Sequence, residues 1–184
     1  MAEFVLKVQD IDERGKDYEF PVTGAWLDGA LEGTPLRRDP SRGEGRFELH
    51  AQRNAGEILV RGALTADLLI ECSRCLSDAP LHVQTDVTAL LSQAGADELP
   101  EEVELDAEDL DRAHFIGHEV VLDELVREHL LLETPMQPLC APGCQGIQVP
   151  AHVRPPAEAF GEGRVDPRLS PLQQLRGKLS GKKE

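Results

Sequence analysis

The sequence predicts an α+β fold: a mainly antiparallel β-sheet or partly open barrel with one packed helix, a split four-cysteine zinc knuckle and a short C-terminal helix. Three observations predict it. Several segments alternate apolar and polar residues with the period of a strand, and one later segment repeats with the period of a helix. The four cysteines of the chain lie in two short pairs that are far apart in sequence.

Four segments have the alternation expected of strands, at residues 4–8, 47–51, 58–70 and 81–89. Between the second and third, the run from Arg53 to Glu57 contains Ala55-Gly56, and glycine accepts the unusual backbone angles of a hairpin turn. The third and fourth segments predict another hairpin, with the first cysteine pair in its turn. We expect these strands to pair antiparallel.

The predicted helix covers residues 121–132. Its apolar residues recur at spacings of three and four, and Asp123 or an earlier polar residue is expected to cap its start. Pro135 ends it, and the chain then runs directly into the second cysteine pair. A helix packed on the sheet would therefore bring the second pair back to the first.

The cysteines form two clips, Cys72-Ser-Arg-Cys75 and Cys140-Ala-Pro-Gly-Cys144. Zinc takes four thiolates in a closed structural site, and each short pair supplies two of them. The spacing therefore predicts a structural zinc ion on Cys72, Cys75, Cys140 and Cys144. Disulfide bonds, redox-active thiols and inert thiols remain open as alternatives. Disulfides belong to oxidising compartments, for which the N-terminal residues provide no export signal. Thiol redox chemistry, with Arg74 lowering a thiol pKa, lacks its usual βαβ context.

The length of 184 residues predicts one main domain. We expect it to span residues 1–149 and to include an acidic loop at 92–114. Residues 150–184 are expected to form a linker rich in proline and glycine, followed by a basic amphipathic tail. No stretch is apolar and long enough to cross a bilayer, so we expect no membrane partner. The N-terminal residues lack a basic region followed by an apolar one, so we expect a cytoplasmic protein.

Charge is distributed unevenly along a chain with a formal net charge of -15. Residues 97–111 hold nine carboxylates and no Lys or Arg, which is typical of a solvated loop or of a docking strip for a basic protein. The tail from Arg164 to Glu184 carries six Lys or Arg. Within the tail, Ser170-Pro171-Leu172-Gln173 has the residues of a helix start.

The search for catalytic residues finds little. His114 and His118 are four apart and would share a face of a helix, but such spacing is common among surface histidines. The chain lacks a nucleophile elbow, a P-loop and a dinucleotide fingerprint. We therefore expect no enzyme activity and no small-molecule substrate.

Three segments together carry a family resemblance: Cys72 to Cys75, Leu130 to Cys144, and Asp166 to Leu175. In content and order they resemble the large ribosomal RNA subunit accumulation protein YceD family. The resemblance implies a bacterial cytoplasmic protein without enzyme activity that supports synthesis, processing or accumulation of large-subunit (23S) rRNA. It also places the family's paired cysteines and intervening arginine on the two clips and on Arg74.

The resemblance and the charge pattern together suggest contacts with large-subunit rRNA or a pre-ribosomal particle. Basic side chains bind phosphate, and we expect that role for Arg74, Arg168, Arg176, Lys178, Lys182 and Lys183. Two alternatives remain: an acidic adaptor that holds a basic ribosomal protein, and a thiol or zinc redox protein.

Overall fold

The computed structural model describes residues 2–93, 112–148, 150, 152 and 153. The chain falls into two compact units, Met1–Gly146 and Ile147–Glu184. All of the helices and strands of the described residues lie in the first unit. The linker and the basic tail predicted for residues 150–184 fall almost entirely outside the described residues, as does the predicted helix near residue 170.

The main sheet has six strands. Its strands follow one another in the order β2-β4-β5-β6-β7, while β3 pairs with part of β5. All neighbouring strands are antiparallel except β6 and β7, which are parallel. Their bounds are Lys16–Val22 (β2), Leu36–Arg38 (β3), Gly45–Asn54 (β4), Glu57–Glu71 (β5), Asp78–Gln93 (β6) and Arg112–Phe115 (β7).

Two hairpins organise this sheet. The first joins β4 to β5 through Ala55 and Gly56, whose φ angles of 48° and 92° are both left-handed, as a two-residue hairpin turn requires. The second joins β5 to β6, whose register runs from Glu57↔Ser92 to Glu71↔Asp78. Both hairpins were predicted from the sequence and are confirmed, including the position of the first cysteine pair between β5 and β6.

A close approach of two backbones explains the glycine in the middle of β5. A Cβ at Gly62 would lie 2.3 Å from the carbonyl oxygen of Glu48 and 2.7 Å from Cβ of Leu49 on β4. Any larger residue would push these two paired strands apart. The side chains on either side of Gly62 along this face, Val60 and Leu64, are fully buried.

One face of the sheet is covered by a layer of shorter elements: the helices α1 (Gly24–Ala30) and α2 (Asp123–Leu132), a two-stranded sheet of β1 (Val5–Lys7) and β8 (Glu119–Val121), and the 3-10 turn Val8–Asp10. Their apolar side chains join the sheet in one core. Phe4 lies at its centre and contacts Phe20, Trp26 and Phe47 edge to face, with ring centroids 4.8–6.1 Å apart.

The opposite face of the sheet is polar. The outward side chains of β4 and β6, such as Glu48, His50, His82 and Asp86, are exposed, whereas their alternating neighbours Phe47, Leu49, Val83 and Val87 are buried. A sheet with one covered face and one solvated face follows from this period-two pattern.

Several expectations need correction. The segment 4–8 forms only the short strand β1, which pairs with β8 outside the main sheet, because Val8 already starts the 3-10 turn. The helix α1 was missed because seven residues with two glycines give too little periodicity to detect. The described part of the sheet runs from β2 to β7 without closing, so it forms no closed barrel.

Two expectations about the acidic loop and its histidines were also wrong. Ser92 and Gln93 belong to β6 and residues 112–114 to β7, so the loop is shorter than 92–114, and residues 94–111 lie outside the described residues. His114 is in β7, where Nδ1 lies 2.9 Å from Oγ of Ser92, and His118 lies in the turn before β8. These two histidines therefore share no helix.

The predicted helix at 121–132 is confirmed as α2, but its start is built differently. Leu122 occupies the N-cap position and makes no side-chain cap bond. Asp123 instead accepts hydrogen bonds from the backbone N–H groups of Glu3 and Phe4, at 3.0 and 3.2 Å, and from Nε1 of Trp26, at 2.8 Å. This carboxylate joins the N-terminal segment, α1 and α2.

Candidate metal centre

The first cysteine pair lies in the turn at the end of the β5–β6 hairpin. Cys72 continues the ladder, since its N–H donates to the carbonyl of Ser77 at 2.9 Å, and its own carbonyl accepts from Leu76 N–H at 3.0 Å. Leu76 has a left-handed φ of 62°, which turns the chain sharply within the loop. The turn therefore folds Cys72 and Cys75 toward a common point.

The second pair is brought there by the segment that follows α2. The carbonyl of Pro138 accepts from both N–H and Oγ of Ser73, at 2.9 and 2.8 Å. Nη1 of Arg74 donates to the carbonyl of Cys144 at 3.0 Å. These contacts join the two loops independently of the cysteine side chains.

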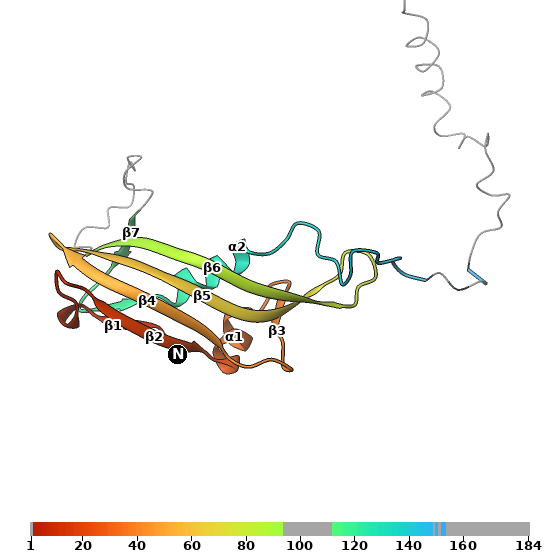
Figure 1. Ribbon diagram of the computed structural model, residues 1–184, viewed down its shortest axis with the longest axis horizontal. Helices are drawn as coiled ribbons and strands as arrows, with labels where there is room; N and C mark the ends of the chain where they lie inside the picture. Colours follow the sequence, from red (N-terminus) through yellow and green to blue (C-terminus); the bar gives the residue numbers. More distant parts are fainter. Residues whose placement is uncertain (1, 94–111, 149, 151, 154–184) are drawn as a thin grey trace, which may run out of the picture. The chain divides into compact units, whose positions relative to one another are not determined.

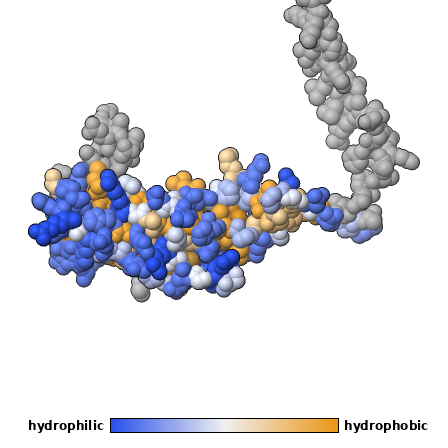
Figure 2. Space-filling model, viewed as in Figure 1, coloured by the Kyte–Doolittle hydropathy of each residue, from blue (hydrophilic) through white to orange (hydrophobic). Residues whose placement is uncertain are grey.

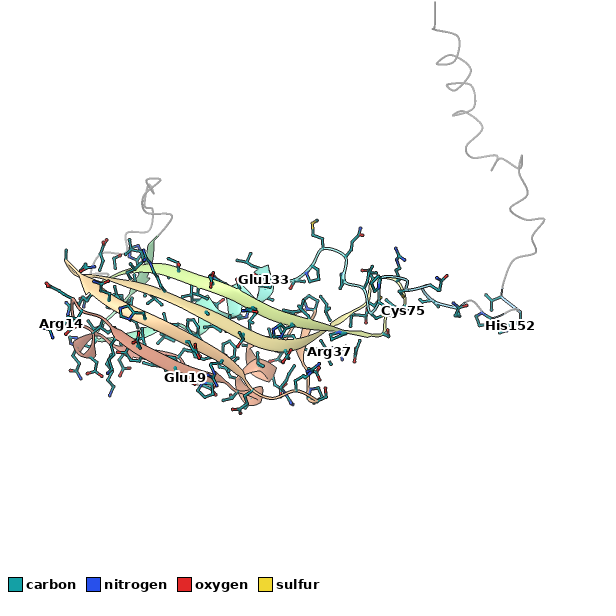
Figure 3. All side chains as sticks on the ribbon, in the orientation of Figure 1. Arg14, Glu19, Arg37, Cys75, Glu133 and His152 are labelled. Atoms are coloured by element: carbon teal, nitrogen blue, oxygen red, sulfur yellow. The ribbon has the colours of Figure 1, made fainter. Side chains whose placement is uncertain are left out.

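The four sulfur atoms form one compact cluster, in which all lie within 4.8 Å of one another. Sγ of Cys72 is 3.9 Å from Sγ of Cys144, and Sγ of Cys75 is 3.5 Å from Sγ of Cys140. Four thiolates at metal–sulfur distances of about 2.3 Å around a tetrahedral ion would be separated by about 3.8 Å. The arrangement fits a tetrahedral metal ion. Figure 3 shows Cys75 at the far end of the hairpin, beyond Arg37.

Backbone N–H groups favour the thiolate form of part of this cluster. Hydrogen bonds from the N–H groups of Cys140, Arg74 and Cys75 lower the pKa of Cys72 to about 6, against an ordinary value of 9.0. The Ser77 hydroxyl and N–H lower the pKa of Cys75.

Cys144 behaves in the opposite way. The N–H of Gly146 acts to lower its pKa, but hydrogen bonds to the neighbouring sulfurs, Cys75 first, together with burial raise that pKa to about 11. The surroundings therefore act unequally on the four thiols: they favour the thiolate at Cys72 and Cys75 and the protonated thiol at Cys144. A cation at the centre would allow all four to ionise.

Disulfide bonds and a redox-active thiol, the alternatives to a metal centre, fit the structure less well. All four are free thiols, and the sulfur separations of 3.9 and 3.5 Å are far beyond the roughly 2.05 Å of a disulfide bond. A redox-active thiol has to be reachable, yet Cys72, whose pKa is lowered to about 6, is 0% exposed.

Exposed hydrophobic side chains occur in the turn of the hairpin and in the segment between α2 and the second cysteine pair. Leu76 is 55% exposed, Leu139 is 36% exposed and Met136 is fully exposed. Figure 2 shows hydrophobic surface at this end, whereas the opposite end of the sheet is strongly hydrophilic.

The predicted nucleic-acid contacts divide into two groups. Arg74 is exposed, and one of its N–H groups is committed to the Cys144 carbonyl. The tail residues Arg168, Arg176, Lys178, Lys182 and Lys183 lie outside the described residues.

Sequence reasoning missed the residues that join the two loops, Ser73 with Pro138, and Ser77 as a donor to a cysteine. A serine next to a cysteine belongs to no recognisable sequence pattern. Its closeness to the cysteine motif was the only feature of the sequence that could have indicated its role.

The described helices include none long and apolar enough to cross a membrane.

The fold and the cysteine cluster define a class: a small α+β protein in which a candidate metal centre clips a β-hairpin to the segment after a helix. The family model for the large ribosomal RNA subunit accumulation protein YceD matches residues 60–176. The chain belongs to this family, and the matched range contains both cysteine pairs and Arg74.

The individual proteins that match the chain have low sequence identity to it. The chain is 27% identical over 165 residues to the uncharacterized protein YlbN of Bacillus subtilis, covering 87% of this chain and 88% of that protein. It is also 27% identical over 134 residues to the uncharacterized protein Rv2926c of Mycobacterium tuberculosis, covering 71% of this chain. The match spans 61% of the length of that mycobacterial protein. No solved structure matches the chain.

Proposed function

We propose that this protein is a non-enzymatic ribosome-biogenesis factor of the cytoplasm that supports synthesis, processing or accumulation of large-subunit (23S) rRNA. The observation that carries the proposal is the family match over residues 60–176, because the family is described by its effect on accumulation of this RNA. The cysteine centre supports a scaffold role, since four thiolates leave a tetrahedral ion no open position for a substrate.

Zinc is the ion we propose for the centre. Thiolate donors in a tetrahedral arrangement suit zinc, and this pattern with all positions occupied is characteristic of structural sites. The ion would hold Cys72 and Cys75 on the hairpin to Cys140 and Cys144 after α2. These residues would fix the loop that presents Arg74.

Arg74 is the described residue that we propose for phosphate contact. A guanidinium has five N–H donors, of which one is bound to the Cys144 carbonyl, so the remaining edge can bind a phosphate while the side chain stays oriented. The tail residues Arg168, Arg176, Lys178, Lys182 and Lys183 are proposed to supply further phosphate contacts from the basic end of the sequence.

A test of the function is complementation. We expect deletion of the gene in the source bacterium to lower the ratio of 23S to 16S rRNA, and the intact gene to restore it. The Arg74→Ala variant should restore it less well than Arg61→Ala, a matched arginine on the outer face of β5. An unchanged rRNA ratio after deletion would contradict the proposed function.

The second candidate is an acidic adaptor that holds a basic ribosomal protein and does not bind RNA. The net charge of -15 favours it. Salt weakens both modes of binding, so crosslinking in cells separates them: recovery of 23S rRNA supports the first candidate, and recovery of a basic ribosomal protein without rRNA supports the second. A third class, a thiol or zinc redox protein, requires a thiol that reacts in the metal-loaded protein.

A further inference from the structure

Strand β6 has a neighbour on only one side for most of its length. It pairs with β5 from Asp78 to Ser92. On its other side, β7 pairs only with residues from Leu90 to Gln93. Within the described residues, the position beside β6 is therefore vacant from Ala79 to Ala89, directly in line with β7. Figure 1 shows β6 along this margin of the sheet.

The register identifies which backbone groups face the vacant side. Cys72 and Ser77 continue the β5–β6 ladder, and Cys72 N–H donates to the carbonyl of Ser77. In an antiparallel ladder such bonded pairs alternate with non-bonded pairs. The odd-numbered residues of β6 therefore bond to β5, and the even-numbered residues direct their N–H and C=O groups away from it. Pro80 agrees with this assignment, because proline in a sheet belongs where no ladder N–H is needed.

Three consecutive even positions, His82, Gln84 and Asp86, thus present an N–H and a C=O each to the vacant side. Their side chains are exposed on the outer face of the sheet. Proteins usually protect such an edge with lysine, proline, a bulge or a covering segment. From Asp78 to Gln93, β6 contains no Lys or Arg, and Pro80 protects only the end nearest the cysteines.

We infer that this edge of β6 binds an extended basic segment of a partner protein, which adds to the sheet as a further strand. Backbone hydrogen bonds to His82, Gln84 and Asp86 would supply affinity, as in other cases of strand addition. The charge of the partner follows from the outer face. Asp86 has no ion pair among the described residues, and Asp67 on the adjacent strand lies 2.9 Å from Nδ1 of His82.

The two faces of the added strand would differ. Its outward side chains would lie beside His82, Gln84 and Asp86, where Lys or Arg is favoured by Asp86 and Asp67. Its inward side chains would lie beside Leu81 and Thr85, which are only partly buried at present. The segment that fits is one in which basic and apolar residues alternate. The inference does not depend on RNA binding or on the metal, and it can fail without affecting either.

The test uses the full chain and three synthetic peptides: one that alternates Lys and Val, one that alternates Glu and Val, and one with the Lys and Val of the first in two blocks. Binding is measured by fluorescence anisotropy at physiological salt. We expect the alternating Lys–Val peptide to bind at least tenfold more tightly than either of the others. Hydrogen exchange should show new protection at the amides of His82, Gln84 and Asp86.

Two variants of Gln84 separate the contribution of its backbone N–H to binding from that of its side chain. Gln84→Pro removes the edge N–H, and Gln84→Thr keeps it; we expect only the proline variant to weaken binding, by at least tenfold. Asp86→Asn should weaken binding of the Lys–Val peptide severalfold. Trp26 fluorescence checks that each variant is folded. If Gln84→Pro does not fold, the hydrogen-exchange pattern of the unmodified chain with the Lys–Val peptide shows whether the peptide binds at the edge of β6.

Three results would overturn the inference: equal binding of all three peptides, protection on β2 in place of β6, or a self-associated chain that Gln84→Pro dissociates and that binds no peptide. The last result would make a second copy the occupant of the edge.

Discussion

We expect the Asp123→Ala variant to unfold at a markedly lower denaturant concentration than the unmodified protein. The carboxylate accepts three hydrogen bonds, from the N–H groups of Glu3 and Phe4 and from Nε1 of Trp26. A hydrogen bond to a charged group contributes about 1.5–3 kcal/mol. The three bonds share one half-buried carboxylate and are not additive, so we expect the free energy of unfolding to fall by about 2–4 kcal/mol.

The assay is urea unfolding followed by the fluorescence of Trp26, the single tryptophan of the chain. With a urea dependence of about 1–3 kcal/mol per molar, a loss of about 3 kcal/mol moves the midpoint by about 1–3 M. The matched control is Glu124→Ala, which removes the next carboxylate along α2. Glu124 is exposed and bonds Arg127 at 3.1 Å, so its loss should cost less than about 1 kcal/mol.

Equal losses for the two variants would refute the reasoning that Asp123 connects three elements. An intermediate loss is expected for Asp123→Asn, because its amide oxygen can replace one acceptor but its NH2 group faces a backbone donor. A change in the fluorescence of the native state of Asp123→Ala, before any unfolding, would follow from the freed Nε1 of Trp26.

Four further outcomes are expected. Protein purified without added metal should contain one zinc ion per chain, with all thiols protected until denaturation; the absence of metal, with reactive thiols, would remove the zinc proposal. At pH 7 zinc binding should release fewer than four protons, measured by calorimetry in buffers of different ionisation enthalpy, because Cys72, with a pKa of about 6, is already mainly thiolate. The number released should rise as the pH falls through 6, and a release of four protons at pH 7 would contradict this. Arg74→Met should leave zinc bound but loosen the second cysteine loop, seen as faster removal by a chelator, since the bond to the Cys144 carbonyl is lost. Gly62→Ala should destabilise the chain by about 1–3 kcal/mol, measured by urea unfolding, because the new Cβ would overlap the carbonyl of Glu48; an unchanged midpoint would contradict this.

The parts of the fold that could be predicted from sequence are those with a long, uninterrupted period. Alternation over Ile58 to Ile70 and the helical spacing around Val126 and Leu130 each depend on many residues, so both elements were found. The short elements were not. Helix α1 has seven residues with two glycines, and β8 has three, so neither shows a period.

The pairing of strands was predictable only where a short turn dictates it. The parallel contact of β6 with β7 joins segments separated by the acidic run, and no local residue indicates it. The candidate site likewise has one part that could be predicted from local sequence and another that could not. The spacing of Cys72 and Cys75 and of Cys140 and Cys144 indicated the four cysteines that cluster, whereas the bond of Arg74 to a carbonyl became visible only once both loops were placed.

The distance in sequence between the two clips has a consequence for the newly made chain. Cys75 and Cys140 are separated by 65 residues. At synthesis rates of about 5–20 residues per second, the first pair emerges from the ribosome about 3–13 s before the second pair does. During that interval the first clip is a bare dithiol, open to the wrong metal or to oxidation. An ion held by all four sulfurs would therefore mark a chain whose translation has passed residue 144 and whose hairpin and second loop have already met.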